Sequence, residues 1–328
     1  MSRLLTFYLL LFVLFIVSCV DKNAKTTIEP PAEKKLIAAD FNADSAFVFL
    51  EKQVAFGPRI PNTASHQKCA SWLEYKMRSY CKNVTIQKFS AKAYDGKMLN
   101  LTNIIASYNP DTAYRVLLLA HWDTRPFADN DPDETKRKQT FDGANDGGSG
   151  TAVLLEIARQ LSLKNPQTGI DILLLDGEDY GAPMDEKSLV EDDWCLGTQY
   201  WAKFPHTMLY TARFGILLDM VGAAEAVFYK EGTSMYFAPD FVNKVWNVAS
   251  EIGFGQYFSS ETSQPITDDH VYVNQIRQIP CIDIIQHDPT TPSGFYKNWH
   301  TLNDNMSGIS SKTLEAVGKT VLTAALAQ

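Results

Sequence analysis

The chain has 328 residues, of which 45% are hydrophobic and 21% are charged. This hydrophobic content supports a sizeable core and excludes a globally disordered chain. Lysine and arginine number 30 against 38 aspartates and glutamates, a net charge of -8. The acidic balance argues against a nucleic-acid partner, because such a partner needs a basic face.

The amino terminus carries an apolar stretch, residues 4–18, directly after Arg3. It is too short to span a bilayer comfortably and has the length of a signal peptide. Ile16-Val-Ser-Cys19 resembles a bacterial lipobox, in which cleavage precedes a cysteine that then carries lipid. We therefore expect a lipoprotein signal peptide over residues 1–18, a lipidated Cys19 followed by a polar tether to residue 39, and a lipid-anchored periplasmic protein of the bacterial cell envelope. A plain secretory signal with an incidental cysteine is the alternative.

Four cysteines remain after Cys19, namely Cys69, Cys81, Cys195 and Cys281. An even number permits disulfides without proving them. Cys69 and Cys81 fall on one predicted helix and are too far apart to pair if that helix continues to Cys81. No Cys-x-x-Cys pattern indicates a thiolate metal site.

Caps, periodicity and apolar runs predict alternating helices and strands along residues 40–328. The predicted helices cover residues 42–56, 64–80, 151–163, 241–252 and 310–326, with a short one opening at 267–270. The predicted strands cover residues 84–89, 101–108, 116–120, 172–175, 214–220 and 279–285. No internal repeat or linker interrupts them. We expect one α/β domain with a mixed, mostly parallel central sheet flanked by helices on both faces.

Acidic residues follow the strand at residues 172–175. Gly177 breaks the apolar run and leaves Asp176, Glu178 and Asp179 at its carboxyl end, where open α/β sheets bind their ligands. Carboxylates this close are costly in a low-dielectric cleft unless a cation or a shared proton relieves them. The stretch therefore indicates a metal site, with a solvated acidic turn as the alternative.

Two other strands end in the same way. The strand at 116–120 runs into His121-Trp-Asp123, whose first and third residues point to one side, as an imidazole with its orienting carboxylate would. The strand at 214–220 presents Asp219. We expect these side chains to meet in one crevice beneath the polar segment 124–140. Asp146 precedes a glycine-rich helix start that lacks the lysine of a phosphate loop.

The serial order of these residues resembles the zinc-dependent aminopeptidase superfamily and, within it, the bacterial zinc glutaminyl cyclases. The resemblance begins at Phe56 and covers nearly the whole domain. It implies a catalytic zinc with an open fourth position, held by Asp146, Asp179 and His300. The cyclases have glutamate where this chain has Asp179. The remaining implied roles are a catalytic acid/base at Glu178, a carboxylate network at Asp219 and Asp268, and an aromatic pocket wall at Trp299.

The resemblance implies that the chain converts the N-terminal glutamine of peptides and proteins into pyroglutamate and releases ammonia, as a glutaminyl-peptide cyclotransferase. A metallo-aminopeptidase is the alternative, since His121 and Asp219 with a bridging Asp146 could hold a second zinc. We expect one zinc without excluding two. A second metal or a supporting shell could also involve Asp123, Asp269 and His270. Asp268 and Trp299 favour the cyclase, and a non-catalytic peptide- or metal-binding lipoprotein is a third possibility.

Overall fold

The structure is a computed structural model that describes residues 36–164 and 166–327. The expected signal peptide, Cys19 and most of the expected tether lie outside the described residues. The compact unit begins at Leu36. Its first residues are tied to the fold, because the backbone N–H of Ala39 donates to Oγ1 of Thr323 at 2.9 Å. Among the described residues, no helix combines the length and the apolarity that a membrane span requires.

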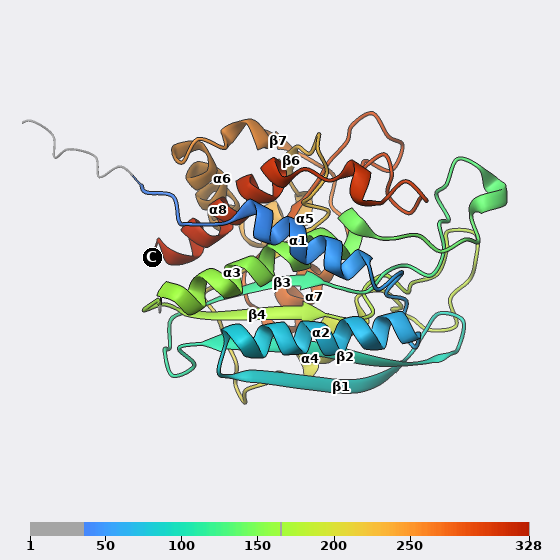
Figure 1. The fold of residues 1–328 in the computed structure, drawn as a ribbon, viewed down its shortest axis with the longest axis horizontal. Helices are drawn as coiled ribbons and strands as arrows, with labels where there is room; N and C mark the ends of the chain where they lie inside the picture. The colour runs from blue at the N-terminus through green and yellow to red at the C-terminus, as the bar shows by residue number, and fades with distance from the viewer. Residues whose placement is uncertain (1–35, 165, 328) are drawn as a thin grey trace, which may run out of the picture. The chain divides into compact units, whose positions relative to one another are not determined.

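A six-stranded sheet forms the centre of the fold, in the order β1-β2-β4-β3-β5-β8 (Figure 1). β4, β3, β5 and β8 are parallel, whereas β1 and β2 pair antiparallel and β2 pairs antiparallel with β4. The strands are β1 (Val84–Lys92), β2 (Met98–Tyr108), β3 (Arg115–His121), β4 (Gly169–Leu175), β5 (Phe214–Asp219) and β8 (Cys281–Ile285). The sheet is mixed and mostly parallel, as the sequence predicted.

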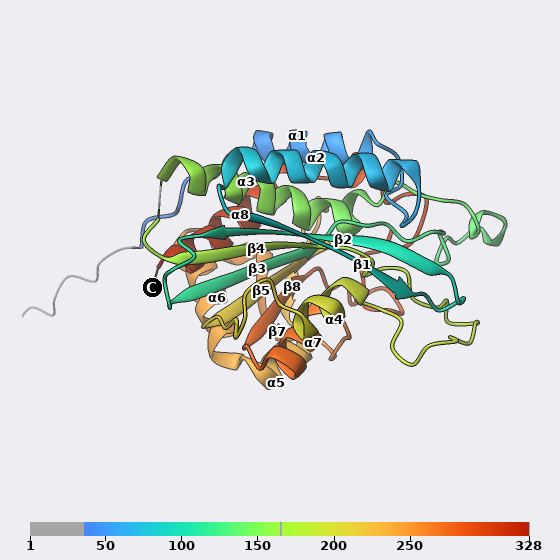
Figure 2. The ribbon, with the colours of Figure 1, turned by 90° about the horizontal axis from the view of Figure 1, so that it is seen from below.

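Helices cover both faces of the sheet (Figure 2). They are α1 (Ala43–Val54), α2 (Ala64–Tyr80), α3 (Gly150–Lys164), α4 (Leu196–Lys203), α5 (Gly232–Phe237), α6 (Pro239–Glu251), α7 (Asp269–Tyr272) and α8 (Ser311–Leu326). α1, α2, α3 and α8 lie on one face, and α4 and α7 lie on the other. The central strands are therefore buried on both sides. On β3, Leu118 packs into the core under α3, while Leu117 and Leu119 pack into a second core with Trp201 of α4.

The predicted helices all form, with ends shifted by a few residues. Asn42 caps α1, since its side chain accepts the N–H of Ser45 at 2.9 Å. The sequence did not predict α4, α5 or the two-stranded sheet of β6 (Phe228–Lys230) and β7 (Phe258–Thr262). These elements span only three to eight residues, which is too short for a helical or an alternating pattern to emerge.

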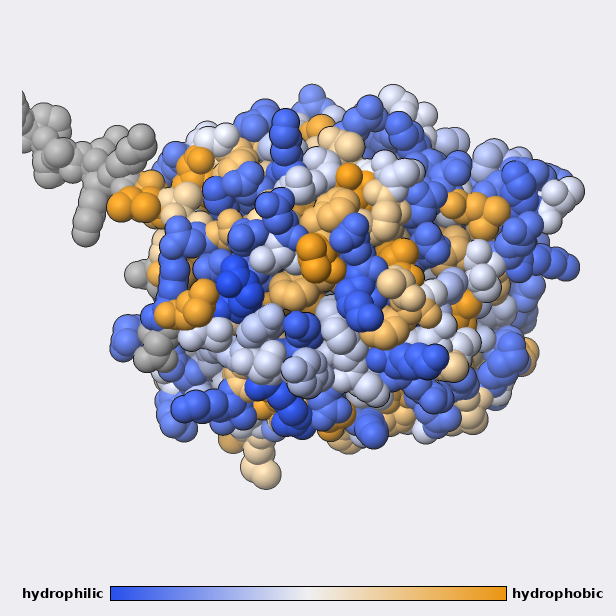
Figure 3. Space-filling view, in the orientation of Figure 1, coloured by the Kyte–Doolittle hydropathy of each residue, from blue (hydrophilic) through white to orange (hydrophobic). Residues whose placement is uncertain are grey.

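The described cysteines are all free and buried. Figure 3 shows the face over α1 and α2, on which hydrophilic side chains surround smaller hydrophobic areas. Scattered exposed apolar residues of this kind are normal on a protein surface.

Candidate active site

Three neighbouring parallel strands end beside one another. β3 ends at His121, β5 ends at Asp219, and β4 leads into the turn that carries Glu178 and Asp179. Gly177 opens this turn with a φ of 73°, a left-handed conformation that suits glycine because it has no Cβ. The structure thus places the predicted strand-end side chains at one edge of the sheet.

Asp146, Asp179 and His300 come together at this edge. Each is buried, and one potential ligand atom from each lies within 4.8 Å of the other two. Nε2 of His300 is 3.1 Å from Oδ1 of Asp179 and 3.4 Å from Oδ2 of Asp146. Oδ1 of Asp179 is buried, and its approach to Nε2 of His300 does not have the geometry of a hydrogen bond, so it has no hydrogen-bond partner among the described residues. Two carboxylates and one imidazole, with an oxygen left unsatisfied, fit the ligand set of a catalytic zinc.

Two further carboxylates hold these ligands in place. Asp304 accepts the backbone N–H groups of Asn145 at 2.7 Å and Asp146 at 3.1 Å, so it fixes the turn that presents Asp146. Oδ1 of Asp129 lies 3.2 Å from Nδ1 of His300. A carboxylate at this nitrogen leaves Nε2 of the imidazole free to bind a metal.

The turn at Glu178 and Asp179 is held from two sides. Asp123 accepts the backbone N–H of Glu178 at 3.1 Å and of Asp179 at 3.2 Å. The backbone N–H of Arg125 donates to Oδ2 of Asp179 at 3.1 Å, and its guanidinium donates to the carbonyl of Gly181 at 3.1 Å. Asp123 therefore supports the ligand turn through its backbone as well as lying 3.5 Å from Nδ1 of His121.

His121, Asp146 and Asp219 form a second group in which three ligand atoms lie within 4.8 Å of one another. Nε2 of His121 is 3.1 Å from Oδ1 of Asp146 and 3.1 Å from Oδ1 of Asp219. Because Asp146 belongs to both groups, it could bridge two ions. The geometry of the ligands therefore permits one ion or two.

Glu178 lies beside the metal ligands, half-buried and close to other carboxyl groups. Burial raises its pKa well above the ordinary range, and the nearby carboxylates of Asp179 and Asp268 raise it further. Burial also raises the pKa of Asp268, with Asp219 adding to the effect. A carboxylic acid that can hold its proton near neutral pH is suited to general acid and base catalysis.

A cavity of about 300 Å³ lies over these groups. Its lining includes Glu178, Asp268 and Trp299 together with apolar side chains such as Phe295. Trp299 stacks on His300 with ring centroids 3.9 Å apart. A larger hollow of about 720 Å³ shares Trp299 and His300 with this cavity, and segments 125–138 and 180–194 supply most of its walls. The polar segment 124–140 therefore does flank the site.

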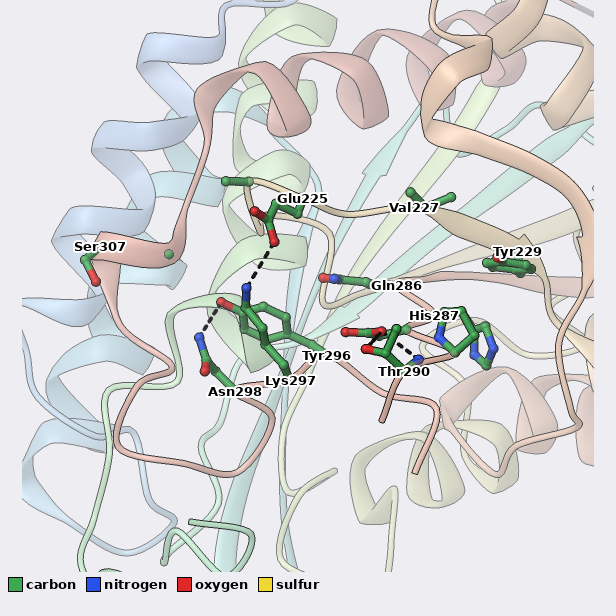
Figure 4. A pocket seen from close by; sticks show the side chains of 14 residues that line it. Glu225, Val227, Tyr229, Gln286, His287, Thr290, Tyr296, Lys297, Asn298 and Ser307 are labelled. Carbon is green, nitrogen blue, oxygen red and sulfur yellow. Dashed lines mark hydrogen bonds and ion pairs between the residues drawn. The ribbon is translucent and has the colours of Figure 1, made fainter. Parts of the chain in front are cut away.

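A third hollow, of about 590 Å³, has a lining that includes the residues just before Trp299 in the chain (Figure 4). Tyr296, Lys297 and Asn298 line it, and Lys297 forms an ion pair with Glu225 at 3.0 Å. It contains none of the predicted site residues.

The structure separates two predicted residues from the metal ligands. Nε2 of His270 pairs with Glu231 at 3.1 Å, and His270 belongs to none of the groups that could hold a metal. Asp269 accepts the hydroxyl of Thr198 at 2.6 Å. His270 is therefore not among the side chains that the structure groups as possible metal ligands, and its role in a second metal site or a supporting shell stays a prediction.

Several residues of the site were missed by the sequence analysis. They are Asp129, Asp304 and Cys195, together with Asp283, which is fully buried on β8 near Asp268. Asp283 interrupts an apolar strand, and a charged residue in such a run is itself a signal that could have been followed. The other three lie in loops, where no sequence period indicates which way a side chain points.

Comparison with known proteins agrees with this geometry. A family model described as peptidase family M28 matches residues 103–325. The crystal structure of Bacteroides thetaiotaomicron glutaminyl cyclase bound to N-acetylhistamine is 49% identical, covers 89% of this chain and 100% of that chain, and has a TM-score of 0.86. A Zn-dependent exopeptidase from Parabacteroides distasonis is also 49% identical over the same shares, with a TM-score of 0.87.

A relative with lower sequence identity is also named as a glutaminyl-peptide cyclotransferase. The glutaminyl-peptide cyclotransferase of Drosophila melanogaster is 26% identical over 286 residues, which are 79% of this chain and 73% of the fly protein. The fold, the buried Asp146–Asp179–His300 group and these similarities lead to one assignment: the chain belongs to peptidase family M28 and is similar over most of its length to the bacterial glutaminyl cyclases.

Proposed function

We propose that the protein cyclises the N-terminal glutamine of peptides and proteins to pyroglutamate and releases ammonia. The observation that carries this proposal is a half-buried carboxyl group, Glu178, directly beside a set of zinc ligands and facing a small cavity. The 49% sequence identity between this chain and a solved glutaminyl cyclase supports the same activity.

Asp146, Asp179 and His300 would hold the zinc. When bound, zinc polarises a carbonyl group and stabilises the negative charge that develops on its oxygen. The chain supplies the remaining chemistry. The substrate's α-amine is tethered near its own γ-carboxamide, so the main task of the cavity is to hold the two groups together and keep water away.

Glu178 is proposed to transfer protons between the attacking α-amine and the leaving nitrogen. It would take a proton from the attacking α-amine and return one to the nitrogen that leaves as ammonia, and a raised pKa suits both steps. Asp268 and Asp219 would share protons with one another beside it, because several buried acids this close cannot all be ionised. Trp299 would pack against the flat atoms of the substrate.

We propose that a single zinc is sufficient. Nε2 of His121 forms a hydrogen bond with Oδ1 of Asp219 at 3.1 Å, so these two side chains can hold each other without a second ion. Cyclisation also brings its own nucleophile, whereas peptide hydrolysis needs an activated water, which two metals supply well.

Two peptides separate the candidate functions. The purified protein is incubated with one peptide that begins with Gln and one that begins with Leu, and the product masses are measured. Loss of ammonia from the first peptide alone supports the cyclase. Removal of the first residue from either peptide would show a metallo-aminopeptidase instead, and unchanged masses would favour a binding protein.

We also propose that the protein is a lipoprotein anchored in the bacterial cell envelope through Cys19, facing the periplasm. The apolar segment that ends at Cys19 supports this location. Replacing the cysteine, Cys19→Ala, should move the protein out of the membrane fraction or leave it unprocessed, as judged by cell fractionation and by the mass of the amino-terminal fragment. Normal processing and membrane association in this variant would rule out lipidation at Cys19.

A further inference from the structure

Cys195 occupies an unusual backbone position at the start of α4. Its φ is 54° and its ψ is 36°, which is the left-handed region. A side chain in this region is strained because its Cβ approaches the neighbouring carbonyl oxygen, and glycine is the residue that avoids this strain. The chain nevertheless has a cysteine here, and the cysteine is fully buried. Strained positions of this kind cluster at functional sites.

The side chain of Cys195 points to the proposed catalytic acid. Its Sγ donates to Oε1 of Glu178 at 3.3 Å. One potential ligand atom from each of Glu178, Cys195 and Asp268 lies within 4.8 Å of the other two, so the thiol lies close to both acids. Burial raises the pKa of Cys195 well above its ordinary range, so the thiol keeps its proton and remains a donor.

The backbone of Cys195 also contacts Glu178, at its main-chain carbonyl group. The N–H of Cys195 donates to the carbonyl of Glu178 at 2.9 Å, and the N–H of Leu196 donates to the carbonyl of Gly177 at 3.0 Å. Asp123 accepts the N–H of Glu178. The backbone of Glu178 is thus fixed at both its N–H and its carbonyl, and the thiol is the one described hydrogen-bond partner of its carboxyl group.

We propose that Cys195 is a positioning residue for Glu178: its thiol holds Oε1 so that the other oxygen, Oε2, is presented to the substrate. This inference rests on the proposed acid/base role of Glu178. It assigns no bond making or breaking to the thiol, and it explains why a side chain is retained where glycine would be less strained.

Three substitutions separate positioning from packing. Cys195→Ser keeps a donor, Cys195→Ala removes it, and Cys195→Gly removes it and also relieves the left-handed backbone. We expect the single-turnover rate to fall about fivefold in the Ala and Gly variants and to be largely rescued in the Ser variant, with KM and zinc content unchanged. A packing role predicts instead that activity follows thermal stability, so that a Gly variant as stable as the wild type would also be as active as the wild type.

Cys81 provides the matched control. It is also a buried thiol, and it donates to the backbone carbonyl of Ser107 at 3.4 Å, away from the metal ligands. Cys81→Ala should change stability while leaving the turnover rate at the wild-type value. Wild-type rates in Cys195→Ala and Cys195→Gly would overturn the proposal.

A structural measurement keeps this test independent of the proposed function. If the wild-type protein releases no ammonia, the proposed function has failed. Crystal structures of the wild type and of Cys195→Ala still test whether Cys195 positions the carboxyl group of Glu178. We expect the Glu178 carboxyl group to rotate away from its wild-type orientation in the variant. A carboxyl group that stays in place would refute the role of Cys195, whatever the activity.

Discussion

Three residues with side chains adopt left-handed backbone conformations around the metal ligands. They are Cys195, Met220 and His300, with φ values of 54°, 47° and 53°. Met220 and His300 line the 300 Å³ cavity, and Cys195 contacts Glu178 behind it. Such conformations are kept only when the surrounding packing and hydrogen bonds determine them. Packing and hydrogen bonds therefore determine the backbone conformation of the site, and this conformation places the ligand and acid side chains next to one another.

At the scale of one residue, the sharpest prediction concerns Glu178. Glu178→Gln keeps the shape of the side chain and removes its ability to carry a proton. We expect turnover to fall by on the order of 10²- to 10⁴-fold while zinc content and thermal stability stay near wild type, because the proposed zinc ligands are Asp146, Asp179 and His300 and do not include Glu178. Ammonia release and metal analysis measure the two effects. Glu51→Gln on the exposed surface of α1 is the control, and a fully active Glu178→Gln would remove Glu178 from the mechanism.

At the scale of the element, the central strands carry polar anchors as well as apolar side chains. Asp171 lies in the middle of β4 and is fully buried. Its carboxylate accepts hydrogen bonds from the hydroxyl of Ser107 at 2.6 Å, the guanidinium of Arg115 at 2.6 and 2.7 Å, and the hydroxyl of Tyr210 at 2.8 Å. These donors come from β2, β3 and the loop before β5, so one carboxylate joins several neighbouring segments.

The strand-level prediction is that Asp171→Asn destabilises the fold by about 3 kcal/mol at neutral pH, because it leaves Arg115 buried and unpaired. Burial alone would raise the pKa of Asp171, but its hydrogen-bond donors lower it from 3.8 to about 2. The folded state therefore holds this proton more weakly than the unfolded state does. The stabilisation is present above about pH 4 and is lost as the pH falls through about 2.

Denaturant unfolding at several pH values tests this sign. The difference in free energy of unfolding between wild type and Asp171→Asn should shrink as the pH falls toward 2. Asp111→Asn, on the exposed turn before β3, is the control. If the difference in free energy of unfolding between wild type and Asp171→Asn grows at low pH, the lowered pKa of Asp171 in the folded state is contradicted.

At the scale of the whole molecule, the site joins segments that are far apart in the chain. Its ligands come from the turn before α3, the turn after β4 and the loop before α8. Several of the clustered carboxyl groups have raised pKa values, including Asp179 at about 6 and Asp304 at about 7, chiefly because of burial. A cation among them should relieve this repulsion and bind these segments together.

Metal removal should therefore affect both activity and stability. After chelation, we expect turnover to be abolished and the melting temperature to fall on the order of 10 °C, since metal that binds only the folded state stabilises it. Adding zinc back should restore both. Metal analysis of the active protein decides between one ion and two, and an enzyme that stays fully active without metal would exclude the proposed chemistry.

The sequence by itself determined the frame of the fold. Apolar runs of strand length predicted β3, β4 and β5, and parallel strands present their carboxyl ends at one edge, so the pattern of the chain alone groups His121, Glu178 and Asp219. Short-range sequence patterns are sufficient for these residues. The alternation along a strand and the position of its last residue determine on which side of the sheet the following side chain lies. The ligand roles of Asp146, Asp179 and His300 came from resemblance to a family.

Only the tertiary structure decided how the loops meet. His270 follows directly after an acidic pair in the sequence, yet its ring pairs with Glu231 in the core. Asp304 and Asp129 support the ligands from loops, and Cys195 reaches Glu178 from the start of a helix that no pattern predicted. Loop side chains have no period that fixes their direction, so these contacts depend on how distant segments pack, which the sequence specifies only through the whole fold.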